Sequence, residues 1–175
     1  MKEQTFDPLG KYPEPAKLRA GCCCEYAIIR RGEPVPSPVA DTPGAIYDFY
    51  QSHMRTLPVF NPDVECFWVI FLNTRRRVTG FHMVSTGNLD TILVHPRECF
   101  KAAIVCSASA VVFLHNHPSG DPTPSEADIK VTREMARAGQ ILKINLLDHV
   151  IAGSPLPGFI LPYVSLRELG YCTNQ

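Results

Sequence analysis

The chain has 175 residues and a mass of 19.5 kDa, which corresponds to one domain of ordinary size with an extension. Hydrophobic residues make up 45% of it, enough to bury a core, so a wholly disordered chain is excluded. Lys and Arg number 17 and so do Asp and Glu, which argues against binding of nucleic acid or anionic membranes by overall charge.

The N-terminal residues lack the apolar stretch of a secretory signal, and no apolar run reaches the roughly 18 residues of a membrane span. The seven cysteines are an odd number and contain no C-x-x-C pair, which favours reduced thiols over disulfides or a thiolate zinc cluster. These features predict a cytoplasmic protein without membrane association.

Residues 1–62 hold nine of the 16 prolines and are predicted to be an N-terminal extension. Within it the pattern predicts a short strand over 22–30 and a helix over 43–53. Thr42 fits the N-cap of that helix, and Pro43 its first helical position. Ile46, Phe49 and Tyr50 would form its apolar face.

Residues 63–175 are predicted to form the domain itself. β-branched and aromatic runs predict strands at 64–72, 78–84, 91–94, 110–114, 141–152 and 158–163, and helices are predicted at 96–107 and 125–138. Gly139 is expected to end the second helix, and Gly87 to permit a turn at 85–89. Strands and helices alternate irregularly, which favours a mixed α+β arrangement over a regular parallel sheet.

Two histidines leave the apolar strand at 110–114 together. His115 and His117 are two residues apart, so the period of a strand directs both imidazoles to the same face. Asp128 follows one turn into the next helix, on a face shared with Val131, Met135 and Ala138. An acid on a buried face must be paired, protonated or bound to a metal.

Two histidines and a carboxylate leave one tetrahedral position open, the pattern of a catalytic zinc site. The same ligand set also suits iron, cobalt or nickel. Ser125 and Asp128 equally fit a helix capping box that needs no metal, and both roles can coexist at Ser125.

The string HNHPSGDPTPSEAD at 115–128, followed by LLDHVIAG at 146–153, resembles the JAMM motif of JAB/MPN metallopeptidases, and in particular their bacterial RadC-like branch. The resemblance covers about half the chain, from residue 64 to 153. It implies a JAB/MPN-like (cytidine-deaminase-like) mixed β-sheet flanked by helices.

The resemblance also implies the role of each residue in the motif. His115, His117 and Asp128 would ligate one Zn²⁺ per chain. Glu65, at the position of the family's upstream glutamate, would act as general base, and Ser125 would hydrogen-bond the oxyanion. His149, on an apolar strand, is interpreted as a core histidine, with a supporting role behind the ligands left open; Asn116 is a second candidate for such a role.

Two functions remain open at this point. The first is a zinc-dependent hydrolase that acts on a peptide or protein substrate. The second is a DNA-repair-associated accessory protein of the RadC-like type, with Arg75–Arg77 as the candidate phosphate contact. The second is weakened because residues 1–62 show no helix-hairpin-helix pattern, which RadC-like proteins usually carry. The sequence fixes neither the substrate nor the oligomeric state.

Overall fold

The computed structural model describes residues 37–87, 94–154 and 161–172, all within one compact unit, Glu33–Gln175. Helix α1 (Pro43–Phe49) continues into a π-helical turn, η1 (Tyr50–Met54). The elements that follow are, in chain order, β1 (Glu65–Leu72), β2 (Val78–Gly87), α2 (Pro96–Val105), β3 (Ala110–Asn116), α3 (Glu126–Leu142), β4 (Asn145–Ala152) and β5 (Tyr163–Ser165).

The five strands form one mixed sheet in the order β2-β1-β3-β4-β5. All neighbouring pairs are antiparallel except β3 and β4, which run parallel and are joined through α3. This arrangement confirms the predicted mixed α+β class. It also places β3, the strand that carries the histidines, at the centre of the sheet.

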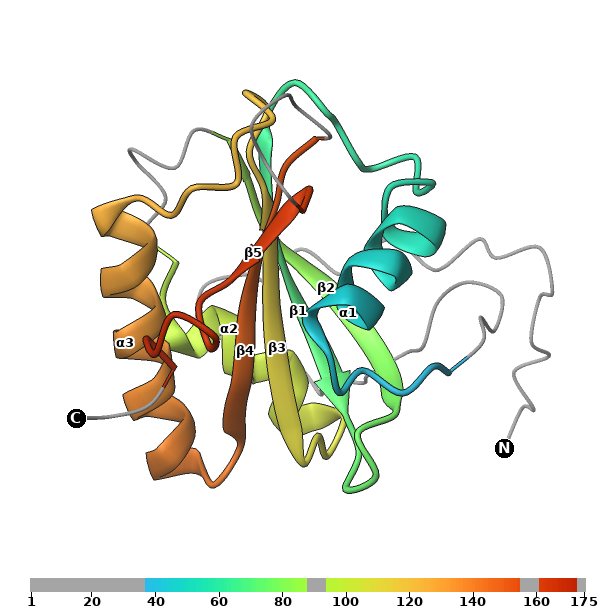
Figure 1. Ribbon diagram of the computed structural model, residues 1–175. Coiled ribbons are helices and arrows are strands. Elements are labelled where there is room, and N and C mark those ends of the chain that lie inside the picture. The colour runs from blue at the N-terminus through green and yellow to red at the C-terminus, as the bar shows by residue number, and fades with distance from the viewer. Residues whose placement is uncertain (1–36, 88–93, 155–160, 173–175) are drawn as a thin grey trace, which may run out of the picture. The chain divides into compact units, whose positions relative to one another are not determined.

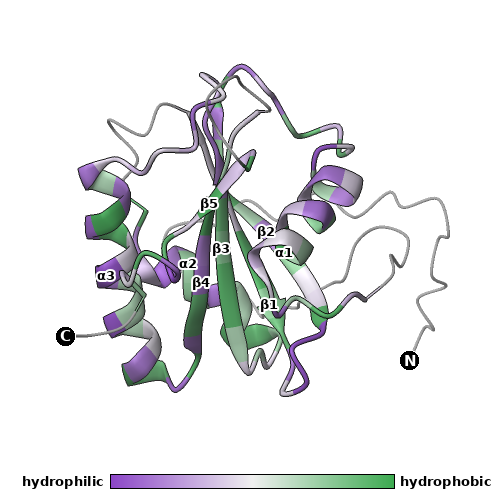
Figure 2. Cartoon of the chain, in the orientation of Figure 1, coloured by the Kyte–Doolittle hydropathy of each residue, from purple (hydrophilic) through white to green (hydrophobic). Residues whose placement is uncertain are grey.

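Helices cover both faces of the sheet (Figure 1): α1 lies on one face, and α2 and α3 lie on the other. The strand period divides the core accordingly. On β1, Trp68 and Ile70 pack with α1, whereas Phe67 and Val69 pack with α2 and α3. Figure 2 shows β1 and β3 as hydrophobic along most of their length, as expected for strands buried on both faces.

Helix α1 begins as predicted. The Thr42 side chain accepts a hydrogen bond from the Ala45 N–H at 3.2 Å, and Pro43 occupies the first helical position. Ile46, Phe49 and Tyr50 are buried against the sheet, so residues assigned above to the extension contribute to the same core as the strands.

Helix α3 ends later than predicted. It continues to Leu142, and Lys143 adopts the left-handed conformation that caps it. Gly139 lies inside the helix, not at its end. The position needs a glycine because a Cβ there would collide with the Ile144 carbonyl oxygen and lie 3.2 Å from the Phe100 ring. The glycine is therefore explained by close packing rather than by chain reversal, and the predicted strand at 141–152 begins only at Asn145.

Two other predicted boundaries are wrong. Ser85, Thr86 and Gly87 do not form a turn but pair with β1, although Gly87 does have a positive φ of 141°. Strand β3 extends through Asn116, because parallel pairing with β4 continues to that residue.

The predicted strands at 22–30 and 91–94, and the start of the one at 158–163, fall outside the described residues; that last strand is described from Tyr163 to Ser165. None of the helices in the described ranges combines the length and the apolar character needed to cross a membrane.

Candidate metal centre

The candidate site lies where β3 ends, β1 begins and α3 starts. His115 is stacked with Phe67, their ring centroids 5.9 Å apart, on the face of the sheet that α2 and α3 cover. Glu65, the first residue of β1, lies two residues before Phe67, and His117, the residue after β3, lies two residues after His115; two residues is one strand period. The topology therefore brings together residues that are 52 positions apart in the sequence.

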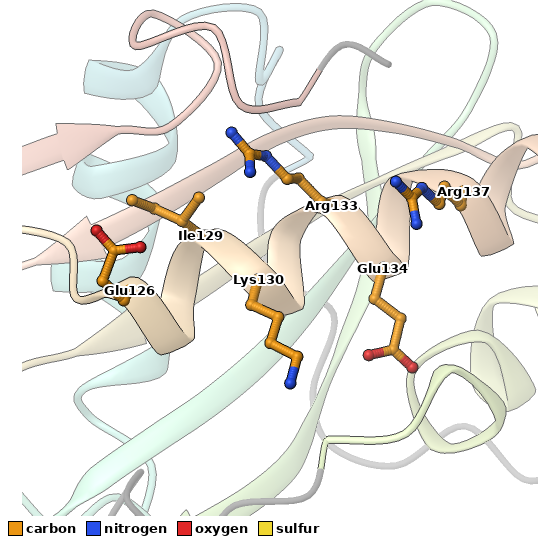
Figure 3. A pocket seen from close by; sticks show the side chains of 6 residues that line it. All are labelled: Glu126, Ile129, Lys130, Arg133, Glu134 and Arg137. Carbon is orange, nitrogen blue, oxygen red and sulfur yellow. The ribbon is translucent and has the colours of Figure 1, made fainter. Parts of the chain in front are cut away.

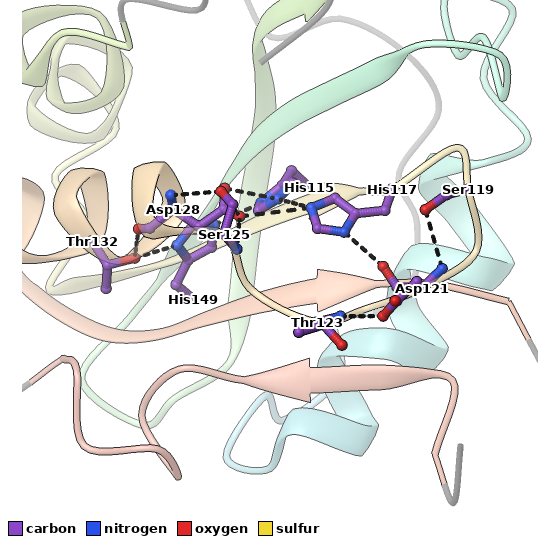
Figure 4. Close-up of polar contacts among 9 residues, drawn as sticks. All are labelled: His115, His117, Ser119, Asp121, Thr123, Ser125, Asp128, Thr132 and His149. Carbon is purple, nitrogen blue, oxygen red and sulfur yellow. Dashed lines mark hydrogen bonds and ion pairs between the residues drawn. The ribbon is translucent and has the colours of Figure 1, made fainter. Parts of the chain in front are cut away.

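Figure 4 shows His115, His117 and Asp128 converging on one point. One ligand atom from each lies within 4.8 Å of the other two. His115 Nε2 is 3.0 Å from His117 Nε2 and 3.2 Å from Asp128 Oδ1, and His117 Nε2 is 3.7 Å from Asp128 Oδ2. His115 is fully buried and Asp128 is 3% exposed, while the His117 side chain keeps 13% exposure, which leaves a solvent-facing side.

The loop after β3 fixes the ring of His117. His117 Nδ1 lies 2.7 Å from the Asp121 carbonyl oxygen, and since a carbonyl only accepts, Nδ1 carries the proton. The loop is held in turn by the Ser154 N–H, which donates to the Gly120 carbonyl at 2.9 Å. Gly153 allows this approach, because a Cβ there would collide with Gly120 and Pro122. When the His117 ring is neutral, its Nε2 is therefore an acceptor that faces the site.

The start of α3 fixes the carboxylate of Asp128. Ser125 donates to Asp128 Oδ2 from its backbone N–H at 2.8 Å and from its hydroxyl at 2.6 Å. The hydroxyl oxygen also accepts from the Asp128 N–H at 3.2 Å, which completes the capping box. Both lone pairs of Oδ2 thus accept hydrogen bonds from Ser125, and Oδ1 is the oxygen nearest to His115.

The buried face of α3, which includes Asp128, matches the sequence prediction only in part. The inner face of α3 consists of Asp128, Thr132, Met135, Ala136 and Gly139, whereas Val131 and Ala138 are only half-buried. Thr132 is fully buried one turn after Asp128, and its hydroxyl reaches the Asp128 carbonyl and His149 Nδ1, both at 2.6 Å. His149, also fully buried, contacts His115: His149 Nε2 is 2.8 Å from His115 Nδ1.

Burial keeps two of the histidines neutral. It lowers the pKa of His115 below its ordinary value, against the opposing effect of Asp128. Burial and the neighbouring His115 together lower the pKa of His149 well below its ordinary value. Both rings therefore act as neutral imidazoles, each with one proton and one lone pair.

The charged forms of His117 and Asp128 are favoured instead. Burial alone would lower the pKa of His117, but the Asp128 carboxylate, the Asp121 carbonyl and the charge of Glu65 favour the protonated ring and raise that pKa overall. Burial alone would raise the pKa of Asp128, yet the adjacent imidazoles of His115 and His117 and the hydroxyl of Ser125 hold that pKa far below its usual range. The site thus favours positive charge at the point where the three ligand atoms meet.

The donor set fits a divalent cation. His117 Nε2 and Asp128 Oδ1 present lone pairs to one point, and neutral His115 faces the same point. Acceptors placed this close repel one another unless positive charge lies between them, and imidazole with carboxylate is a combination that zinc and similar metals bind. His115, His117 and Asp128 are thus the residues that would hold the ion.

Asn116 supports the neighbouring strand. Its Oδ1 accepts from the Cys66 N–H at 2.9 Å, and its Nδ2 donates to the Val64 carbonyl at 3.0 Å. These two bonds continue the β1–β3 pairing through a side chain and fix the backbone on both sides of Glu65. The half-buried Glu65 is close enough to the site for its charge to raise the pKa of His117.

Two other features lie apart from this centre. Arg75–Arg77 are exposed in the β1–β2 turn, at the opposite end of β1 from Glu65, and Arg77 donates to the Ser37 carbonyl. A surface pocket on α3 is lined by Glu126, Ile129, Lys130, Arg133, Glu134 and Arg137 (Figure 3). These six residues form the helix face opposite Asp128 and Thr132, so the pocket contains no candidate ligand.

Fold and site together define a mixed α+β domain with a His-His-Asp cluster at the end of its central strand. The sequence matches the RadC-like JAB domain family over residues 40–171, and the chain belongs to that family. The resemblance seen in the sequence is thus confirmed.

Similar proteins in several bacteria are called UPF0758 proteins. One from Desulfitobacterium hafniense is 46% identical over 138 residues, which are 79% of this chain and 56% of the relative. One from Caldanaerobacter subterraneus is 49% identical over 107 residues (61% and 43%), and one from Symbiobacterium thermophilum is 44% identical over 132 residues (75% and 52%). The chain spans about half the length of these curated relatives.

Sequence reasoning missed two parts of the site. Thr132 lies four residues after Asp128, a spacing that places both on one helix face and could have revealed it. The Asp121 carbonyl is a backbone group, and no residue type signals its role.

Proposed function

We propose that the chain is a zinc-dependent hydrolase that cleaves peptide or isopeptide bonds. One observation carries the proposal: His115, His117 and Asp128 converge at a solvent-facing edge of the sheet, with Glu65 beside them. Three protein ligands with an open side are typical of catalytic rather than structural zinc.

The residues divide the chemistry among them. His115, His117 and Asp128 would hold Zn²⁺, which when bound acidifies water and polarises a carbonyl. Glu65 would accept a proton from water and pass it to the leaving amine. The Ser125 hydroxyl, which donates to Asp128 Oδ2, would turn its proton toward the oxyanion of the substrate.

Metal content and hydrolysis of purified protein test this proposal together. Zinc is expected near one per chain, and His117→Ala should lower it strongly. Fluorogenic peptide and isopeptide libraries should then identify a substrate. Glu65→Gln should keep the zinc and reduce turnover by about 10²-fold or more, because it removes the general base.

Glu126→Gln is the matched control, because Glu126 is an exposed carboxylate on the outer face of α3. It should retain both zinc and turnover. Zinc content that His117→Ala leaves unchanged would contradict the metal site, and equal turnover in wild type and Glu65→Gln would contradict the mechanism.

A further inference from the structure

A chain of buried hydrogen bonds runs from His115 back to α3. His115 Nδ1 contacts His149 Nε2 at 2.8 Å, His149 Nδ1 contacts the Thr132 hydroxyl at 2.6 Å, and that hydroxyl contacts the Asp128 carbonyl oxygen at 2.6 Å (Figure 4). His115, His149 and Thr132 are all fully buried, so water does not compete for these bonds.

The direction of the chain follows from its last member. The Asp128 carbonyl has only lone pairs, so Thr132 must donate to it. A hydroxyl has one proton, and Thr132 can therefore only accept from His149 Nδ1. His149 is fully buried between the uncharged Thr132 hydroxyl and the His115 ring, where a second proton would be costly, so its Nε2 is bare and accepts from His115 Nδ1. His115 Nε2 is left without a proton and faces the site.

We infer that Thr132 and His149 are positioning residues that keep the proton of His115 on Nδ1 and so keep Nε2 free as a ligand atom. The inference rests on the proposed metal site and adds two residues to it. Asp128 acts twice in this scheme: its carboxylate belongs to the ligand set, and its backbone carbonyl fixes the tautomer of another ligand.

The two ligand histidines thus reach the same tautomer by different routes. His117 donates directly to the Asp121 carbonyl on an exposed loop, whereas His115 depends on two intermediates in the core. If the relay were reversed, with His149 protonated on Nε2, His115 would carry its proton on the nitrogen that faces Asp128. The site would then present a donor where a cation must bind.

Thr132→Val tests the relay, and Thr132→Ser is its matched control. Valine has nearly the shape of threonine but no hydroxyl, so His149 loses the acceptor that fixes its tautomer. Serine keeps the hydroxyl. Two-bond ¹H–¹⁵N correlation spectra of chelator-treated protein report which nitrogen of each ring carries the proton. Competition with a chromogenic chelator reports the affinity for Zn²⁺ alone.

We expect wild type and Thr132→Ser to show Nδ1 protonation at His115 and His149 and the same zinc affinity. Thr132→Val should shift both protons to Nε2 and weaken zinc binding by about 10–100-fold. Nε2 protonation of His115 in the wild type would overturn the inference even if the valine variant did not fold. Unchanged tautomers and affinity in Thr132→Val would overturn it as well.

These readouts separate the inference from the proposed function. If the spectra and affinities are as expected but no peptide or isopeptide is cleaved, the relay stands and the hydrolase proposal fails. If cleavage depends on Glu65 while Thr132→Val behaves as wild type, the hydrolase proposal stands and the relay fails.

Discussion

Asn116 fixes Glu65 by hydrogen-bonding to the backbone on either side of it. The two partners, the Val64 carbonyl and the Cys66 N–H, lie 3.0 and 2.9 Å from the amide. Asn116 is 5% exposed and lies between His115 and His117 in the chain. A single side chain on β3 thus links the start of β1, and with it the proposed general base, to the strand that carries His115.

Replacing Asn116 with alanine should therefore impair turnover more than metal binding. The variant leaves the Cys66 N–H and the Val64 carbonyl without partners, which costs about 1–3 kcal/mol in the free energy of unfolding. Loss of alignment at Glu65 should lower kcat by roughly 10–100-fold, with zinc affinity unchanged. Titration with denaturant, chelator competition and kinetics measure the three quantities.

Ser37→Ala is the control for stability alone. The Ser37 hydroxyl donates to the Val78 carbonyl at 2.6 Å, at the end of the sheet away from Glu65. It should lower stability without changing kcat. Equal turnover in Asn116→Ala and wild type would show that Asn116 only stabilises the fold.

The stability of the metal-free protein should fall as the pH drops below about 6.5, the ordinary pKa of histidine. His115 and His149, both fully buried, have lowered pKa values, with burial as the main cause in each. Below pH 6.5 the unfolded chain binds protons that these folded-state rings do not, so unfolding is favoured. Each ring contributes a slope of up to about 1.4 kcal/mol per pH unit.

His117 acts in the opposite direction. Its raised pKa gives stability that is fully present below pH 6.5 and is lost as the pH rises through the folded-state value. Below pH 6.5, His149→Gln should reduce the number of protons taken up on unfolding by up to one, and with it the slope of the free energy of unfolding against pH. Thr132→Ser should leave that slope as in the wild type. Urea titrations of chelator-treated protein between pH 5 and 8 measure this, and an unchanged slope in His149→Gln would contradict the assignment.

Much of the fold and site follows from local pattern. The spacing of His115, His117 and Asp128 predicted a cluster that the structure brings within 4.8 Å. Thr42 and Ser125 marked helix starts correctly, because capping depends on a few neighbouring residues.

The errors arose where distant packing decides the outcome. Gly139 resembles a helix end by local rules, but the approach of the Ile144 backbone requires a glycine inside α3. Likewise, no short-range signal joins Asn116 to Val64 and Cys66, because that contact exists only once β1 and β3 pair. A hydrogen bond from a side chain to backbone groups far away in the sequence is therefore the feature of a site that is hardest to predict from one sequence.

Gly139→Ala tests the packing interpretation. The added Cβ would meet the Ile144 carbonyl oxygen and the Phe100 ring, and backbone cannot move aside as a side chain does. We expect a loss of about 1–3 kcal/mol in the free energy of unfolding, despite the better helix propensity of alanine. Gly80→Ala is the control, since its Cβ would lie 3.4 Å from the Phe71 ring in ordinary contact. A stabilised Gly139→Ala variant would contradict this account.

Ser125 allows capping and catalysis to be separated. Ser125→Ala removes the hydroxyl that bonds Asp128 Oδ2 and the Asp128 N–H, but keeps the backbone N–H that also holds Oδ2. Stability should fall by about 1 kcal/mol, as for other N-cap replacements, and zinc affinity should change little.

Turnover of Ser125→Ala should fall further, by about 10²–10³-fold, if the hydroxyl donates to the oxyanion. Ser125→Thr keeps a hydroxyl at the cap and should retain most of the stability and more of the turnover. In the free protein the Ser125 hydroxyl donates to Asp128 Oδ2, so it cannot donate to a substrate at the same time. When substrate binds, the hydroxyl would donate to the oxyanion instead, and the Ser125 backbone N–H would still hold Oδ2. If Ser125→Ala kept full turnover, Ser125 would serve only as the N-cap of α3 and would have no part in catalysis.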